Sequence, residues 1–299
     1  VFALIRAGYG KAVPLENGYV VREALLQPTM IRSAAERDDF ARQIVSSPLI
    51  WKMLVDRRFE PVWPVLAERA GLRFQVALVR EVAQAEKTFT AAPRVQSAAT
   101  LLAAYRSMAL FDLADRIGQI QPIKPGMSED EGWLINAHVG VLHATGRDDE
   151  GDQRFAELLK LDMGTHRWLI NMAINRISHL VFNGKYAAAR ALLPDTMEKA
   201  TRFASAYGRQ LLRSFAVCAA TGAKDAEGTR IAATALEPHL EDAVGASVDA
   251  LLCLGREDQA AALVVRFLPD VRWRESLIAS FQPAEASFGP NTAPMSPSW

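Results

Sequence analysis

Apolar side chains recur every three to four residues from about Ile31 onward, which is the spacing of one buried face of an α-helix. In the first third of the chain this spacing predicts helices over 31–46, 49–57, 61–70, 73–89 and 94–108. Pro48, Pro61 and Pro93 lie at or just before the start of three of these ranges. A proline is tolerated there because the first N–H groups of a helix have no intrahelical partner. The pattern therefore predicts an all-α protein.

Beyond residue 108 the helical runs are separated by turns that return at a nearly constant interval. Four turns carry a glycine, at Gly146, Gly184, Gly222 and Gly255, and Ala109 marks a degenerate fifth copy. The intervals between these marks are 37, 38, 38 and 33 residues. Glycine adopts the left-handed conformation without a Cβ penalty, so it is a common residue for ending a helix. Each mark therefore predicts the end of one helix and the start of the next.

Small residues follow these marks at a fixed distance. Five positions after four of the marks stand Ala114, Gly151, Ala189 and Ala260, where we expect the second helix of a pair to pass close to the first. A further echo has a similar period, because the Trp-Leu-Ile-Asn at 133–136 recurs at 168–171. Helix pairs repeated at such a period predict a right-handed α-solenoid of antiparallel helix pairs.

Two segments carry signals for a helix start. Ser128 and Glu131 form the pattern of a capping box, in which each side chain bonds the other residue's backbone N–H. Asp195 and Glu198 repeat this arrangement of polar residues directly after Pro194. We therefore expect one helix to stop near residue 193 and another to begin there.

The chain divides into four parts on these signals. Glycines and prolines interrupt any period over 1–30, which we interpret as an irregular lead-in segment. Helical pairs follow over 31–94, the regular repeats over 95–282, and a flexible tail rich in proline and serine over 283–299.

Charge and hydropathy narrow the range of partners. Thirty-four basic side chains balance thirty-four acidic ones, so no net field draws the protein to nucleic acid, and we expect no nucleic-acid partner. No stretch approaches the roughly 20 apolar residues of a membrane span. The first residue is not methionine, so we expect a processed or trimmed start. The compartment, cytoplasmic or periplasmic, and the oligomeric state stay open.

The chain contains two cysteines, Cys218 and Cys253, and their spacing does not suit a metal site. A disulfide between them stays open, but we favour two small buried apolar residues on neighbouring helices. The five histidines form no i,i+4 pair and no metalloprotease motif, so we expect no metal and no cofactor.

The run Gly184-Lys185-Tyr186-Ala187 resembles the inter-helix turn of tetratricopeptide repeats, and Gly146, Gly151 and Phe155 resemble the same pattern. The resemblance covers residues 95–268 most clearly. The chain departs from the family in its period, which exceeds the family's 34 residues at most turns. The resemblance implies a concave groove, lined by the first helix of each pair, that holds a peptide or a partner protein.

The helix predicted from Trp168 to Phe182 has a polar side that is unusual for a solvent-facing surface. It carries amide, hydroxyl and imidazole groups where lysine and glutamate are more common. The candidate ligand-binding residues are Asn171, Asn175, Arg176 and His179, with Asn136 and His143 one repeat earlier. Such amides suit a peptide backbone or a carboxylate. In the alternative interpretation they satisfy buried turns or contact a neighbouring helix.

The sequence favours a protein- or peptide-binding scaffold. Two other functions stay open: a ligand-sensing regulatory domain of a larger protein, and an enzyme whose site is assembled from scattered helical residues. No catalytic motif marks the chain as an enzyme.

Overall fold

The computed structural model describes residues 35, 63–70, 74–270, 272–274 and 277, and every regular element in these ranges is helical. The predicted helices over 31–46 and 49–57, the lead-in segment and the tail lie outside the described residues. The first helices are α5 (Trp63–Ala70), α6 (Phe74–Ala91), α7 (Val95–Ser107) and α8 (Phe111–Gln119). Their bounds confirm the helices predicted over 61–70, 73–89 and 94–108 to within two residues.

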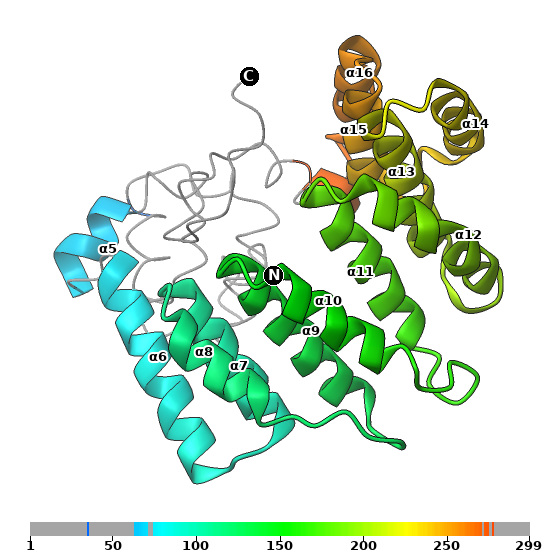
Figure 1. Ribbon diagram of the computed structural model, residues 1–299. Coiled ribbons are helices and arrows are strands. Elements are labelled where there is room, and N and C mark those ends of the chain that lie inside the picture. Colours follow the sequence, from blue (N-terminus) through cyan, green and yellow to red (C-terminus); the bar gives the residue numbers. More distant parts are fainter. Residues whose placement is uncertain (1–34, 36–62, 71–73, 271, 275–276, 278–299) are drawn as a thin grey trace, which may run out of the picture. The chain divides into compact units, whose positions relative to one another are not determined.

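The remaining helices succeed one another as antiparallel pairs (Figure 1). They are α9 (Glu129–Ala144), α10 (Asp148–Leu158), α11 (Leu169–Phe182), α12 (Tyr186–Phe203), α13 (Ala206–Gly222), α14 (Ala226–Leu236), the short 3₁₀ helix η4 (Glu237–His239), α15 (Val244–Cys253) and α16 (Glu257–Phe267). The chain divides into two compact units between Ala114 and Asp115, inside α8. The candidate site lies wholly in the second unit, residues 115–280.

In the first unit α6 packs against α7. The hydroxyl of Tyr105 in α7 donates a hydrogen bond of 2.8 Å to Glu86 Oε1 in α6. This buried contact raises the pKa of Tyr105, through burial first and then through its bond to the carboxylate. The bond fixes the register of the two helices.

In the second unit each helix from α9 to α16 packs against its partner in the pair, and α10 and α12 also pack against the next helix along the chain. The first helices of consecutive pairs also contact one another, α9 with α11, α11 with α13, and α13 with α15. The core follows this order as a series of apolar clusters. One cluster centres on Phe155 between α9, α10 and α11, and the next centres on Ile177 between α11, α12 and α13.

Within the described ranges five turns have the same hydrogen bond, from an N–H back to the carbonyl five residues earlier. The donor–acceptor pairs are Leu110–Tyr105, Arg147–Leu142, Lys185–Leu180, Asp225–Ala220 and Arg256–Leu251. In every case the residue before the donor has a positive φ, as in the Schellman motif that ends many helices. Gly146, Gly184 and Gly255 occupy this position with φ near 70°, so the predicted left-handed turns are confirmed there.

The expectation for Gly222 is wrong. Gly222 is the last residue of α13, and Lys224 adopts the left-handed conformation of that turn, with φ of 58°. The glycine has another role, because a Cβ at Gly222 would lie 2.4 Å from the ring of Tyr186. Ala109, with φ of 54°, confirms that the degenerate copy is a turn of the same kind.

The small residues after the turns are buried, as predicted. Ala114, Ala189 and Ala260 are at most 2% exposed. A Cβ at Gly151 would lie 3.2 to 3.3 Å from side-chain atoms of His143 and Val139 in α9, closer than most such contacts. The second helix of each pair therefore approaches the first closely at these positions.

The predicted helix start at Ser128 is confirmed, because its hydroxyl accepts from the Glu131 N–H at 3.3 Å and its own N–H donates to Glu131 Oε2 at 2.6 Å. The predicted break at Pro194 is wrong, since α12 continues through it. Proline removes the bond to the carbonyl of Arg190, but both residues are exposed, so water can satisfy that carbonyl.

The two tryptophans of the sequence echo occupy different positions. Trp133 lies in the second turn of α9, whereas Trp168 precedes α11. The ring of Trp168 occupies the space where a Cβ of Gly132 would stand. Ten residues connect α10 and α11, and they place the second Trp-Leu-Ile-Asn earlier relative to its helix than the first. The two copies therefore do not occupy equivalent positions.

Candidate functional site

The structure brings two of the predicted residues together across the contact between α9 and α11. Asn175 Nδ2 donates a hydrogen bond of 2.9 Å to Asn136 Oδ1. Both side chains are half-buried. The bond uses one donor and one acceptor, so the Asn136 amide group and the Asn175 carbonyl keep further hydrogen-bonding capacity.

On α11 the residues Asn171, Asn175, Ser178 and Phe182 are spaced by four, three and four positions, so they share one face of the helix. Asn171 is half-buried, and its side-chain amide makes no hydrogen bond with the residues that the structure describes. Phe182 is 69% exposed, and its ring meets that of Phe215 in α13 edge-on at 6.3 Å. This face therefore combines free amide groups with an exposed aromatic ring.

His143 and His179 are also neighbours, but they lie between helices. Their rings stack with centroids 4.4 Å apart, and the side chain of His143 is only 12% exposed. His143 Nδ1 lies 2.5 Å from Asp148 Oδ1, at the first turn of α10. The pair therefore packs α9 against α11, the role that the alternative interpretation gave to these residues.

Arg176 contacts α10. Its Nε and Nη2 donate to the two carboxylate oxygens of Asp152 at 2.8 and 2.9 Å. A bidentate pair of this kind fixes the guanidinium group in place. Of the six predicted residues, Asn136, Asn171 and Asn175 thus lie where a ligand can reach them with unused polar groups.

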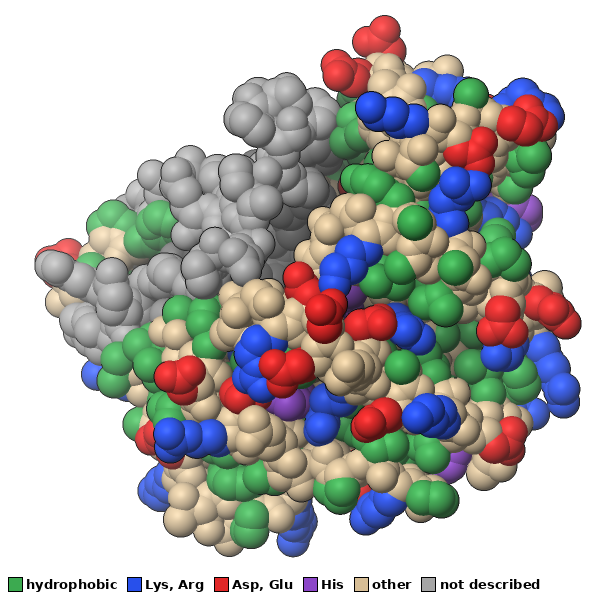
Figure 2. Space-filling model, in the orientation of Figure 1, with side chains coloured by type: hydrophobic (Ala, Val, Ile, Leu, Met, Phe, Trp, Pro, Cys, Tyr) green, Lys and Arg blue, Asp and Glu red, His purple; other side chains and the backbone are tan. Residues whose placement is uncertain are grey.

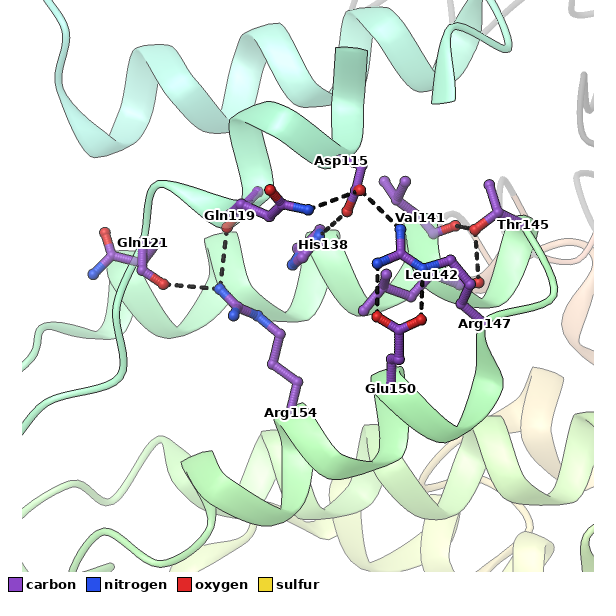
Figure 3. Close-up of polar contacts among 11 residues, drawn as sticks. Asp115, Gln119, Gln121, His138, Val141, Leu142, Thr145, Arg147, Glu150 and Arg154 are labelled. Atoms are coloured by element: carbon purple, nitrogen blue, oxygen red, sulfur yellow. Dashed lines mark hydrogen bonds and ion pairs between the residues drawn. The ribbon is translucent and has the colours of Figure 1, made fainter. Parts of the chain in front are cut away.

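A polar network that the sequence did not predict joins α8, α9 and the start of α10 (Figure 3). Asp115 lies at its centre, with one carboxylate oxygen 2.6 Å from His138 Nε2 and the other 2.8 Å from Arg147 Nη1. Arg147 also forms a bidentate pair with Glu150. Burial tends to raise the pKa of Asp115, but the bonds to His138 and Arg147 outweigh it and lower that pKa. Gln119 Nε2 donates a further bond of 2.9 Å, so Asp115 is a carboxylate held by three donors.

His138 is 3% exposed, and burial lowers its pKa, with Asp115 opposing the shift. Its ring lies where a Cβ of Gly118 would stand, so only glycine leaves room for it against α8. Because Asp115 accepts from Nε2, Nδ1 carries the lone pair, and it has no partner among the described residues. Among the described residues no serine, threonine or cysteine bonds this Asp–His couple, which connects α8 with α9.

Arg154 completes the network from α10. Its Nη2 donates to the carbonyls of Gly118 at 3.1 Å and Gln121 at 2.8 Å (Figure 3). Gly118 belongs to the last turn of α8, whose carbonyls lack intrahelical partners. The guanidinium therefore caps the C-terminal end of α8, where a positive charge is favourable.

The acidic first turn of α10 connects several helices. Asp148, Asp149 and Glu150 lie at the N-terminal end of the helix, where the helix dipole favours negative charge. In addition Asp148 contacts His143, Asp149 pairs with Lys185 at 3.2 Å, and Asp152 pairs with Arg176. Such cross-helix partners leave no local signal in sequence. Of the network only two pairs have a recognisable spacing, Arg147 with Glu150 and Asp115 with Gln119.

No family model matches this chain, and comparison with curated proteins and with solved structures also finds no match. In the described ranges no helix is long and apolar enough to cross a membrane. Nor do three or more His, Cys, Asp or Glu side chains gather there in a way that would hold a metal ion.

Proposed function

We propose that the second unit is a right-handed, tetratricopeptide-like stack of helix pairs that binds an extended peptide segment of a partner protein. The peptide lies along the face shared by the first helices of the pairs, and the amides of Asn136, Asn171 and Asn175 bond its backbone. The observation that carries the proposal is the half-buried amide of Asn171, which has no hydrogen-bonding partner among the described residues and lies one turn from the Asn136–Asn175 pair.

The order of helix contacts supports this arrangement. First helices touch first helices along α9, α11, α13 and α15, and the turns between paired helices share one hydrogen-bonding geometry. Repetition of one unit with neighbour-only contacts is how helical repeat proteins build a long binding surface.

The chemistry of the face supports a peptide as the ligand. Neutral amides have both donors and acceptors, which match the alternating N–H and C=O groups of an extended backbone. The exposed ring of Phe182 offers an apolar contact next to them. In the view of Figure 2 acidic and basic side chains are interspersed over the described surface, without a broad region of one sign that would favour a polyanion.

Selection from a displayed library of random twelve-residue peptides, with the full chain as bait, tests the proposal without a known partner. We expect selected peptides to bind the wild-type protein and to bind Asn171→Ala about 3- to 10-fold more weakly in isothermal titration calorimetry, as the loss of one neutral hydrogen bond predicts. The thermal unfolding midpoint of Asn171→Ala should equal that of wild type, because the side chain of Asn171 bonds no described residue.

Lys199→Ala is the matched control, because Lys199 is an exposed residue of α12 whose side chain bonds no described residue other than Asp195. Peptides that bind wild type, Asn171→Ala and Lys199→Ala equally well would place the binding surface elsewhere. Asn175→Ala is a poorer first test, since it also leaves Asn136 without its partner and lowers stability for that reason.

A further inference from the structure

Cys218 and Cys253, the only cysteines of the chain, are joined by a disulfide. This corrects the expectation of two separate apolar residues. The cysteines do lie on neighbouring helices, α13 and α15, but both are half-buried and their Cα atoms are 5.3 Å apart. Their separation of 35 residues is close to one repeat, which places them at adjacent points on consecutive first helices.

The helices that this bond joins pack closely, but few buried apolar side chains lie between them. Among buried apolar residues α13 contributes Val217, α14 contributes Leu236 and α15 contributes Ala250 to the cluster between them. One buried hydrogen bond of 2.9 Å, from Gln210 Nε2 to Ser247 Oγ, adds to it. The contact between α13 and α15 therefore combines close helix packing with a small apolar cluster, and part of what it buries is polar.

The pair α15 and α16, in contrast, has a larger cluster of its own. Its buried members are Val244, Val248, Leu251, Ala260, Leu263, Phe267 and Leu277. In a linear array each repeat is held only by nearest-neighbour contacts. A pair with a larger cluster of its own therefore separates as a unit when the contact with its neighbour is weakened.

We propose that the Cys218–Cys253 disulfide is a redox-controlled clasp that keeps the α15–α16 pair docked on α13. The oxidant is a small-molecule disulfide such as oxidised glutathione. One protein thiolate attacks it, which forms a mixed disulfide and releases one glutathione thiol. The second protein thiolate then attacks the mixed disulfide, which forms the Cys218–Cys253 bond and releases the second thiol. The two protein thiols lose two electrons and two protons, and the oxidant gains them.

The disulfide forms in an oxidising compartment, which is where most structural disulfides are found. When a reductant opens it, the terminal pair loses its covalent tether, and the face of α15 no longer continues that of α13. The proposal concerns the attachment of this pair and does not depend on what the stack binds.

Hydrogen exchange measured by mass spectrometry on the full chain tests the clasp. We compare protein equilibrated with oxidised glutathione and the same protein reduced with dithiothreitol. Reduction should raise the exchange rate of amides in α15 and α16 by up to about 10²- to 10³-fold, the effect expected for opening a loop of this length. Exchange in α9 to α12 should stay within about two-fold, and reoxidation should restore protection.

The double variant Cys218→Ser/Cys253→Ser is the control, because its exchange must not respond to dithiothreitol. Equal rises in exchange across all helices would mean that the bond stabilises the whole unit and would overturn the clasp. So would unchanged protection of α15 and α16 on reduction, or two free thiols titrated in protein equilibrated with oxidised glutathione.

Discussion

Lys224 occupies a backbone conformation that side chains with a Cβ seldom adopt, with φ of 58° in the turn between α13 and α14. Its side chain is exposed and makes no ion pair with a described residue, so it contributes little that would offset the strain. The equivalent turns at Gly146, Gly184 and Gly255 use glycine. The strain in this turn therefore comes from the residue type and not from the shape of the turn.

Lys224→Gly should stabilise the protein by about 0.5–1 kcal/mol. Glycine removes the steric cost of the Cβ in the left-handed conformation, and this gain exceeds the extra backbone entropy that glycine loses on folding. The midpoint of urea unfolding should rise without a change in slope. Gly184→Ala is the reciprocal control, since its Cβ would meet no atom within 4 Å and so would add strain alone. It should lower stability by about 1 kcal/mol, and a stabilising Gly184→Ala would contradict the argument.

At the scale of elements, the Asp115 network makes the attachment of α8 to α9 and α10 depend on pH. Burial lowers the pKa of His138 below its usual 6.5, so the unfolded chain takes up this proton at a higher pH than the folded protein does. Stability is full above pH 6.5 and declines as the pH falls from there toward the folded pKa. Asp115, whose pKa is lowered, adds a second loss only below about pH 3.8.

Wild-type protein should therefore lose more unfolding free energy between pH 7 and pH 5 than the variant His138→Gln, which keeps a donor for Asp115 but cannot be protonated. Urea unfolding at both pH values measures the difference. Arg147, Glu150 and Arg154 surround the pair and are the same in both proteins, so the comparison isolates the imidazole. Parallel declines in the two proteins would show that other groups cause the pH dependence.

The sequence predicted most helices because their periodicity, caps and left-handed turns are local properties. The predictions failed where contacts between residues far apart in the sequence determine the structure. Gly222 makes room for Tyr186, and Cys218 bonds a neighbouring helix. The asparagines were singled out from helix periodicity, but the pairing of Asn136 with Asn175 depends on the connection between α10 and α11. Its length sets the register of the two helices and leaves no pattern in the sequence.

At the scale of the whole molecule, the balance of charge bears on how a ligand is bound. The formal net charge is zero, and many charged side chains in the second unit already pair with one another across helices. The proposed peptide contacts are neutral amides and an exposed aromatic ring. Binding through such groups releases few counterions and is hardly screened by salt.

The affinity of a selected peptide should therefore change less than about two-fold between 50 and 500 mM sodium chloride, as measured by calorimetry. A nucleic-acid ligand held by several phosphate contacts would instead weaken by orders of magnitude over such a range. A thirty-nucleotide single strand and a duplex of the same length serve as comparison ligands, and we expect neither to bind at 150 mM salt. If salt weakened the peptide more than ten-fold, ion pairs would dominate its binding. The asparagine face would then contribute shape and orientation, and the binding energy would have to come from charged side chains around it.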